Sequence, residues 1–221
     1  MFDEISQHYD FLNHFLSFGI DRKWRKEMIK ILAVRHPETI LDVATGTADL
    51  AIAMTDTHPR KITGIDISEK MLRLADEKIS TAGFKDLITL LPGDAEALPF
   101  PEDTFDAVTV AFGVRNFENL RLGLIEMKRV LHPGGILLIL EFSHPATFPV
   151  KQFYQVYSRL IIPLFGRLIS HHSDAYQYLP DSVASFPSEN SFIAMLEDLG
   201  LKNTGRKSLS MGIASIYWAE K

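Results

Sequence analysis

The strongest constraint on the fold is a regular alternation of β-type runs and helical segments between residues 39 and 141. Five apolar runs are typical of short strands and are separated by helical or turn sequence: 39–43, 61–66, 87–91, 105–111 and 136–141. The last run is almost continuously apolar, as expected for a strand that is buried on both faces. Strands that alternate with helices form a parallel sheet with right-handed crossovers, so the sequence predicts a doubly wound α/β fold.

The predicted helices carry recognisable signals at their ends. Ser68 can cap one helix and Gly83 can end it, while Ser188 and Gly200 bound a later one. Two further helices are predicted at 48–55 and 118–131 from their apolar spacing. The segment 132–135, His-Pro-Gly-Gly, predicts a turn that leads into the fifth strand.

The C-terminal end departs from this alternation. Two β-type runs, 201–208 and 213–219, are joined by a connection too short for a crossover, so they must pair antiparallel. A parallel sheet closed by an antiparallel hairpin is the S-adenosylmethionine (SAM)-dependent methyltransferase variant of the doubly wound fold. We therefore predict a class I, Rossmann-like methyltransferase sheet of seven strands in one domain, 1–221, with an N-terminal helical cap, 1–35, and a helical insertion, 148–186.

Composition narrows the possible partners. The net charge is −5 and no long basic run occurs, so nothing favours nucleic acid as a partner. The chain has no cysteine, which excludes thiolate nucleophiles and thiolate metal sites, and we predict no metal. Acids stand near the N-terminus where a signal peptide needs Lys or Arg, and no run of about 18 apolar residues exists. We expect a cytoplasmic protein without a transmembrane segment.

The segment Asp42–Asp49 lies where the first predicted strand passes into the first helix. Ligands of doubly wound sheets bind in the crevice at this edge. The small residues Ala44, Gly46 and Ala48 let the backbone approach a ligand, and the helix N-terminus can hold a carboxylate such as that of SAM. The usual pattern has glycine at all three positions, and a plain strand-to-helix turn is the alternative interpretation.

Acidic residues after the next two strands extend this expected site. The Asp66 carboxylate can accept hydrogen bonds from both ribose hydroxyls of an adenosine, with a helix cap as the alternative. Ile67 and Met71 can pack against the adenine, or belong to the helix core. Asp94 and the backbone N–H of Ala95 can read the adenine amino group and a ring nitrogen, with a surface turn as the alternative.

Four dispersed segments resemble the ubiquinone/menaquinone biosynthesis C-methyltransferase family. They are Tyr9–Ser17 together with Trp24, Phe112–Phe117, Arg129–Ser143, and 178–187. The resemblance covers nearly the whole chain, although the family usually has a few more residues before position 1. It implies SAM contacts at Thr47, Asp66, Asp94 and Ala95, and at Ala111, where the family carries Ser.

The resemblance also implies a reaction. The family transfers the SAM methyl to a ring carbon of a prenylated quinol, here demethylmenaquinol. The ubiquinone-pathway enzyme, an enzyme serving both pathways, and a non-catalytic SAM-binding partner protein are the alternatives. Because the leaving group is neutral, catalysis rests on positioning and on an electron-rich ring carbon. Arg115 can stabilise a ring oxyanion or form a plain ion pair, and Asn116 can orient the same group. Tyr9 is a third catalytic candidate, with packing as its alternative.

The segment 148–186 is rich in aromatic and aliphatic residues beyond what one buried helix face needs. A lid over an isoprenoid tail, a homodimer interface, a patch that contacts the inner face of the membrane, and ordinary core are four open interpretations.

Overall fold

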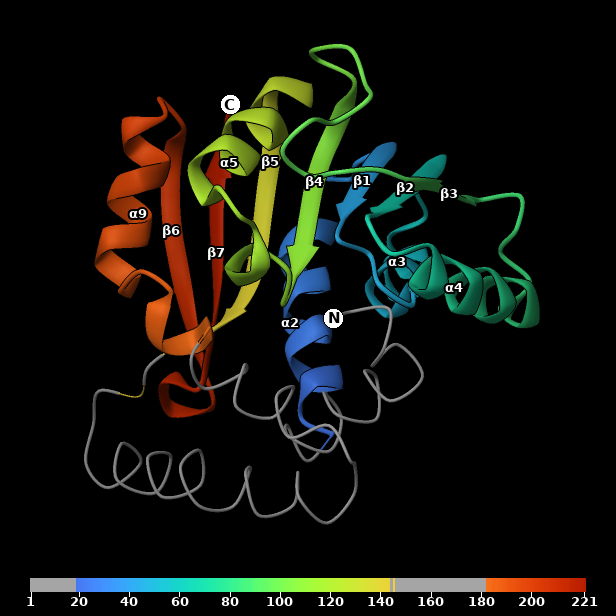
Figure 1. Cartoon of the computed structure of the whole chain (residues 1–221), viewed down its shortest axis with the longest axis horizontal. Coiled ribbons are helices and arrows are strands. Elements are labelled where there is room, and N and C mark those ends of the chain that lie inside the picture. Colours follow the sequence, from blue (N-terminus) through green and yellow to red (C-terminus); the bar gives the residue numbers. More distant parts are fainter. Residues whose placement is uncertain (1–18, 144, 146–181) are drawn as a thin grey trace.

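The computed structural model describes residues 19–143, 145 and 182–221. Seven strands form one sheet in the order β3-β2-β1-β4-β5-β7-β6 (Figure 1). Their bounds are β1 Thr39–Val43, β2 Lys61–Asp66, β3 Ile88–Pro92, β4 Phe105–Ala111, β5 Leu131–Phe142, β6 Lys202–Leu209 and β7 Ala214–Glu220. β1 to β5 are parallel, whereas β7 pairs antiparallel with both β5 and β6. The predicted class I methyltransferase sheet is confirmed.

Helices cover both faces of the sheet (Figure 1). Their bounds are α2 Asp21–Ala33, α3 Asp49–Met54, α4 Glu69–Ala82, α5 Leu120–Val130 and α9 Glu189–Asp198, with short 3-10 turns η1 Thr55–Thr57, η2 Val114–Asn116 and η4 Ser210–Gly212. Ile40 packs in a cluster with residues of α2, α3 and α4, while its neighbour Leu41 packs in a cluster with residues of α5 and α9. Successive strand residues thus alternate between the two layers of core.

The predicted helix ends are also found. The Ser68 hydroxyl accepts a hydrogen bond from the Met71 N–H, and Gly83 ends α4 in the left-handed conformation with φ 78°. The Ser188 hydroxyl likewise caps α9, and Gly200 has a φ of 75°. The predicted cap 1–35 and insertion 148–186 lie largely outside the described residues, so their bounds and the single domain stay predictions. No helix in the described part of the chain is long and apolar enough to cross a bilayer.

The segment 132–135 corrects one prediction, because it forms a bulge inside β5 instead of a turn before it. Leu131 already pairs with Phe105, and the register then shifts so that Ala107 pairs with Ile136. Gly134 adopts a φ of 82°, and its N–H donates to the Lys221 carbonyl. Such a bulge lengthens one strand against its partner, so it depends on the neighbouring strands. It leaves the cavity end of β5 in regular register with β4.

Candidate active site

A cavity of about 330 Å³ opens at the carboxyl ends of the parallel strands. The structure brings together all nine residues that the sequence placed at the cofactor: Ala44, Gly46, Thr47, Asp66, Ile67, Met71, Asp94, Ala95 and Ala111. They come from the segments that follow β1, β2 and β3, and from the end of β4. The topology therefore places side chains that are far apart in sequence around one hollow, as the edge of a doubly wound sheet does.

The loop after β1 adopts left-handed backbone conformations typical of glycine, although two of the three positions are alanine. Ala44, Gly46 and Ala48 have φ values of 52°, 57° and 64°. An L-residue in this left-handed region costs about 1–2 kcal/mol, because its Cβ approaches the following carbonyl oxygen. A Cβ placed on Gly113 would come within 2.7 Å of the Ala44 Cβ, so the two segments touch at this point. The loop is thus held in its path by its surroundings.

The Asp66 carboxylate ties that loop to the end of β2. Its Oδ2 accepts a hydrogen bond from the Gly46 N–H at 2.8 Å, and its Oδ1 accepts one from the Ser68 N–H at 2.9 Å. Each carboxylate oxygen has two lone pairs, so both oxygens can accept a further donor from the cavity. Asp66 therefore shapes the cavity wall and is also exposed to it.

Asp42 is a cavity residue that the sequence did not single out. Its carboxylate is 1% exposed and accepts hydrogen bonds from the hydroxyls of Thr45 at 2.7 Å and Thr109 at 2.8 Å. Burial raises the pKa of Asp42 to about 6, against the lowering effect of the two hydroxyls and of Arg25. An acid at the penultimate position of a buried strand, just before a ligand loop, was the signal that could have identified it.

The raised pKa of Asp42 predicts a pH-dependent stability. Folding favours the protonated carboxyl, so its contribution is full below about pH 4 and is lost as the pH rises through about 6. The free energy of unfolding of the wild type, relative to Asp42→Asn, should therefore fall by about 2 kcal/mol from pH 4 to pH 7. Urea denaturation of both proteins at the two pH values measures this. A difference that stays constant with pH would mean that Asp42 folds ionised.

Arg25 of α2 is a second cavity residue that the sequence did not single out. Its side chain is 11% exposed, and its Nη1 lies 2.5 Å from Asp21 and 3.8 Å from Asp49. Its guanidinium also lies over the Phe112 ring, 5.9 Å from the centroid. Its Nε is buried and has no hydrogen-bond partner among the described residues. Arg25 therefore retains a buried donor beside the cavity.

The charge distribution around the cavity is uneven. Six acids are among the described residues that line it: Asp42, Asp49, Asp66, Asp94, Glu96 and Glu118. Arg25 is the only Lys or Arg in that described lining. Lys78 of α4 reaches the rim, where its Nζ donates to the Thr47 hydroxyl and to Asp49, both at 2.9 Å. Such a cavity suits a ligand with more cationic than anionic groups.

Arg115 does not line the cavity, and the ion-pair alternative describes its position. Its side chain is 3% exposed, and its Nη1 donates to Glu141 at 2.6 Å and to the Phe112 carbonyl at 2.8 Å. Glu141 is fully buried at the end of β5 and also accepts from the Phe142 N–H. A buried carboxylate requires a cation, which explains why Arg115 turns toward β5 and away from the cavity. This position matches the ion-pair alternative, and a direct contact of Arg115 with a ring oxyanion stays a prediction.

The sequence model of the ubiE/COQ5 methyltransferase family matches residues 1–221. The chain belongs to this family. Among its relatives, a demethylmenaquinone methyltransferase of Porphyromonas gingivalis is 44% identical over 223 residues, covering 100% of this chain and 91% of that protein. A ubiquinone/menaquinone biosynthesis C-methyltransferase UbiE of Geobacter sulfurreducens is also 44% identical, covering 100% of this chain and 87% of that protein.

Solved structures resemble this ubiE/COQ5 family member in fold. A putative S-adenosyl-L-methionine-dependent methyltransferase of Methanococcus maripaludis matches with a TM-score of 0.69 and 18% identity, covering 99% of this chain and 93% of that one. A SAM-dependent methyltransferase of Aquifex aeolicus matches with a TM-score of 0.59 and 22% identity, covering 82% and 81%. At these identities the likeness concerns the fold.

The other two predicted catalytic residues are Asn116 and Tyr9, and the structure describes the first of them. Asn116 lines the cavity, and its Nδ2 donates to the Phe112 carbonyl at 3.4 Å. Tyr9 lies outside the described residues, as does 148–181 of the predicted insertion. In the described part of the chain, no group of three or more His, Asp or Glu side chains could hold a metal.

Proposed function

We propose that this ubiE/COQ5 family member is a SAM-dependent C-methyltransferase that converts demethylmenaquinol to menaquinol. The observation that carries the proposal is the cavity at the carboxyl edge of a methyltransferase sheet, which the described residues line with one arginine and six acids. The names of the relatives that are 44% identical over the full chain support a quinol acceptor.

The charges of the cavity fit those of SAM. SAM carries one anionic group, its carboxylate, and two cationic groups, its ammonium and its sulfonium. Arg25 offers a buried Nε beside the cavity that has no hydrogen-bond partner within the described part of the chain, which suits the carboxylate. The surrounding acids, including the buried Asp42, suit the two cationic groups. One cation facing several carboxylates is therefore the arrangement that this ligand requires.

The adenosine part has its own set of residues. Both oxygens of Asp66 can accept from ribose hydroxyls while they hold the loop at Gly46. Asp94 uses Oδ1 to accept from the Glu96 N–H at 2.9 Å, so its Oδ2 can accept from the adenine amino group. Ile67 and Met71 line the same cavity and can cover the adenine face. These roles of Asp66, Asp94, Ile67 and Met71 are part of our proposal.

The quinol is expected to bind where η2 meets the cavity. SAM supplies an activated methyl group when bound, so the protein has to orient the ring and exclude water. Asn116 is the polar side chain of η2 that lines the cavity, and its amide can hold a ring hydroxyl. Arg115 acts as a positioning residue in this proposal, because both it and Asn116 donate to the Phe112 carbonyl. Tyr9 stays a predicted catalytic residue.

Replacing Arg25 tests the placement of the SAM carboxylate. Arg25→Gln should weaken SAM binding about 10- to 100-fold, because a hydrogen bond between charged groups contributes about 1.5–3 kcal/mol. Binding of decarboxylated SAM should change much less, since it lacks the group that Arg25 holds. Calorimetry with both ligands measures this, and Lys26→Gln on the exposed face of α2 is the matched control. Equal weakening for both ligands would contradict the assignment.

The acceptor is tested by competition. The purified protein, with SAM labelled in its methyl group, is offered reduced demethylmenaquinone and the reduced ubiquinone precursor at equal concentration. We expect the label to enter the naphthoquinol with the larger kcat/KM. Comparable transfer to both acceptors would indicate an enzyme serving both pathways. Binding of SAM without transfer to either would favour the non-catalytic SAM-binding alternative. A homodimer and contact with the membrane remain predictions.

A further inference from the structure

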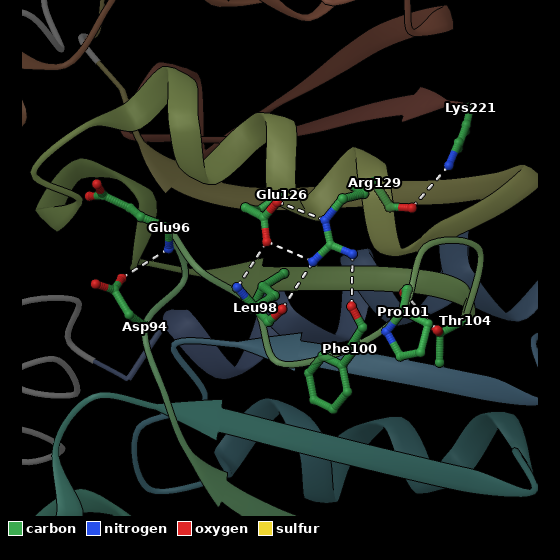
Figure 2. A network of polar contacts seen from close by, with 9 residues as sticks. All are labelled: Asp94, Glu96, Leu98, Phe100, Pro101, Thr104, Glu126, Arg129 and Lys221. Atoms are coloured by element: carbon green, nitrogen blue, oxygen red, sulfur yellow. Dashed lines mark hydrogen bonds and ion pairs between the residues drawn. The ribbon is translucent and has the colours of Figure 1, made fainter.

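The loop 93–104 between β3 and β4 is held to α5 by two side chains, Glu126 and Arg129 (Figure 2). Arg129 Nε and Nη2 each lie 2.7 Å from one oxygen of the Glu126 carboxylate. Arg129 also donates to the Phe100 carbonyl at 2.7 Å and to the Leu98 carbonyl at 2.9 Å. Glu126 completes the arrangement by accepting from the Leu98 N–H at 2.9 Å. Five hydrogen bonds thus connect one guanidinium and one carboxylate to each other and to the loop.

The pair is poorly suited to a role in global stability. The side chain of Arg129 is 33% exposed and that of Glu126 is 16% exposed. Ion pairs that water reaches contribute about 0–1 kcal/mol to folding. The Arg129 guanidinium holds the pKa of Glu126 below its usual range, so the carboxylate stays ionised well below neutral pH. The planar guanidinium of Arg129 instead fixes the direction of two loop carbonyls. The geometry of this group matters more for that role than its charge.

The same loop carries the cavity residues proposed to read the adenine. Asp94, Ala95 and Glu96 line the cavity. Glu96 donates its N–H to the Asp94 carboxylate, and its own carboxylate accepts from the Asn119 N–H at 2.7 Å, at the N-cap of α5. The loop is therefore attached to α5 at two places, by the Glu96 carboxylate at Asn119 and by the Glu126 and Arg129 side chains (Figure 2). The orientation of the Asp94 carboxylate depends on the path of this segment.

Other contacts hold the far end of the loop without these side chains. The Asp103 N–H donates to the Arg129 carbonyl, and the Thr104 N–H donates to the Val130 carbonyl. The Lys221 Nζ bridges the loop and α5, because it donates to the Asp103 carboxylate at 2.6 Å and to the Arg129 carbonyl at 3.0 Å. All three contacts use backbone carbonyls of α5, so a change in the Arg129 side chain leaves them available. Replacing the Arg129 side chain should therefore affect the part of the loop that leads to Asp94, while the far end stays attached.

We propose that Arg129 and Glu126 are positioning residues that fix the loop 93–104 for recognition of the adenine amino group. Their side chains form hydrogen bonds with the backbone of Leu98 and Phe100, through which they act on the loop. The inference rests on the proposed function, which places the adenine at Asp94 and Ala95. It predicts that replacing Arg129 or Glu126 lowers the selectivity of binding for adenine, with little change in the free energy of unfolding.

Two ligands and two matched variants test this. The ligands are S-adenosylhomocysteine and S-inosylhomocysteine, in which a carbonyl replaces the adenine amino group. Wild-type protein should prefer the adenosyl ligand. Arg129→Gln should weaken binding of that ligand on the order of 10-fold and weaken the inosyl ligand much less, since contacts in one network are typically coupled to this degree. Arg121→Gln removes the same charge from an exposed position of α5 and should change neither affinity.

Further readouts separate positioning from a general loss of structure. Amide hydrogen exchange at 94–100 should accelerate in Arg129→Gln, while exchange in β2 and α4 stays unchanged. Arg129→Lys should not restore selectivity, because an ammonium lacks the planar fork. Glu126→Gln combined with Arg129→Gln should cost little beyond Arg129→Gln alone. Equal weakening of both ligands in Arg129→Gln would overturn the inference. Failure of the wild type to bind either ligand would overturn the proposed cofactor site itself.

Discussion

Replacing Arg115 with Met should lower the free energy of unfolding by about 3–5 kcal/mol, because the fully buried Glu141 carboxylate loses its cation. Met retains an unbranched apolar stem, so most of the loss reflects the charge and its hydrogen bonds. The Arg115 guanidinium also lies 5.3 Å from the centroid of the Phe142 ring, a contact that the variant loses as well. Urea denaturation at pH 7 measures the change.

A double variant supplies the control. In Arg115→Met combined with Glu141→Gln, neither member of the pair leaves a buried charge, so the double variant should be more stable than Arg115→Met alone. The two interpretations of Arg115 then separate. A positioning residue loses stability and activity together. A large loss of kcat with a change in unfolding free energy below about 1 kcal/mol would restore the direct oxyanion role that the sequence suggested.

Asp66→Ala should weaken SAM binding by about 100-fold or more. The variant removes the acceptor for the Gly46 and Ser68 N–H groups and the proposed acceptor for the ribose hydroxyls. Each hydrogen bond to a charged group contributes about 1.5–3 kcal/mol, so the losses at one carboxylate combine to this size. Calorimetric titration with SAM measures the change.

The matched control for Asp66 is Asp86→Ala, which removes an exposed carboxylate between α4 and β3. Its affinity for SAM should equal that of the wild type. Circular dichroism of both variants confirms that each is folded before binding is compared. Unchanged affinity in folded Asp66→Ala would exclude the adenosine role of this residue.

The centre of the sheet could be predicted from the sequence because β1, β4 and most of β5 are buried on both faces. The predicted bounds of β1, β2 and β4 coincide with those found, since each run of strand-forming residues ends where loop residues begin. The bulge at 132–135 could not be predicted in the same way. It depends on how β5 pairs with β4 and on a contact between Gly134 and the chain end at Lys221, neither of which periodicity reveals.

The sequence predicted the cavity residues that follow the ends of strands. Asp66 and Asp94 follow neighbouring parallel strands, so the topology alone brings them together. Arg25 comes from α2, where it reads as one more polar residue of an amphipathic helix. The Glu141 partner of Arg115 lies 26 residues further along, at the end of the adjacent strand. The position of Arg25 and the pairing of Arg115 with Glu141 both depend on burial of a charged side chain. The spacing of residues in the sequence does not indicate such burial.

The most direct test of the central claim is the position of the transferred methyl group. The full chain is incubated with demethylmenaquinol and SAM that carries a ¹³C-methyl group, and the extracted product is examined by NMR. We predict a labelled methyl group bonded to a ring carbon, at the position adjacent to a ring hydroxyl. A label on a ring oxygen, or SAM binding with no label transferred to the quinol, would contradict the proposed C-methyltransferase.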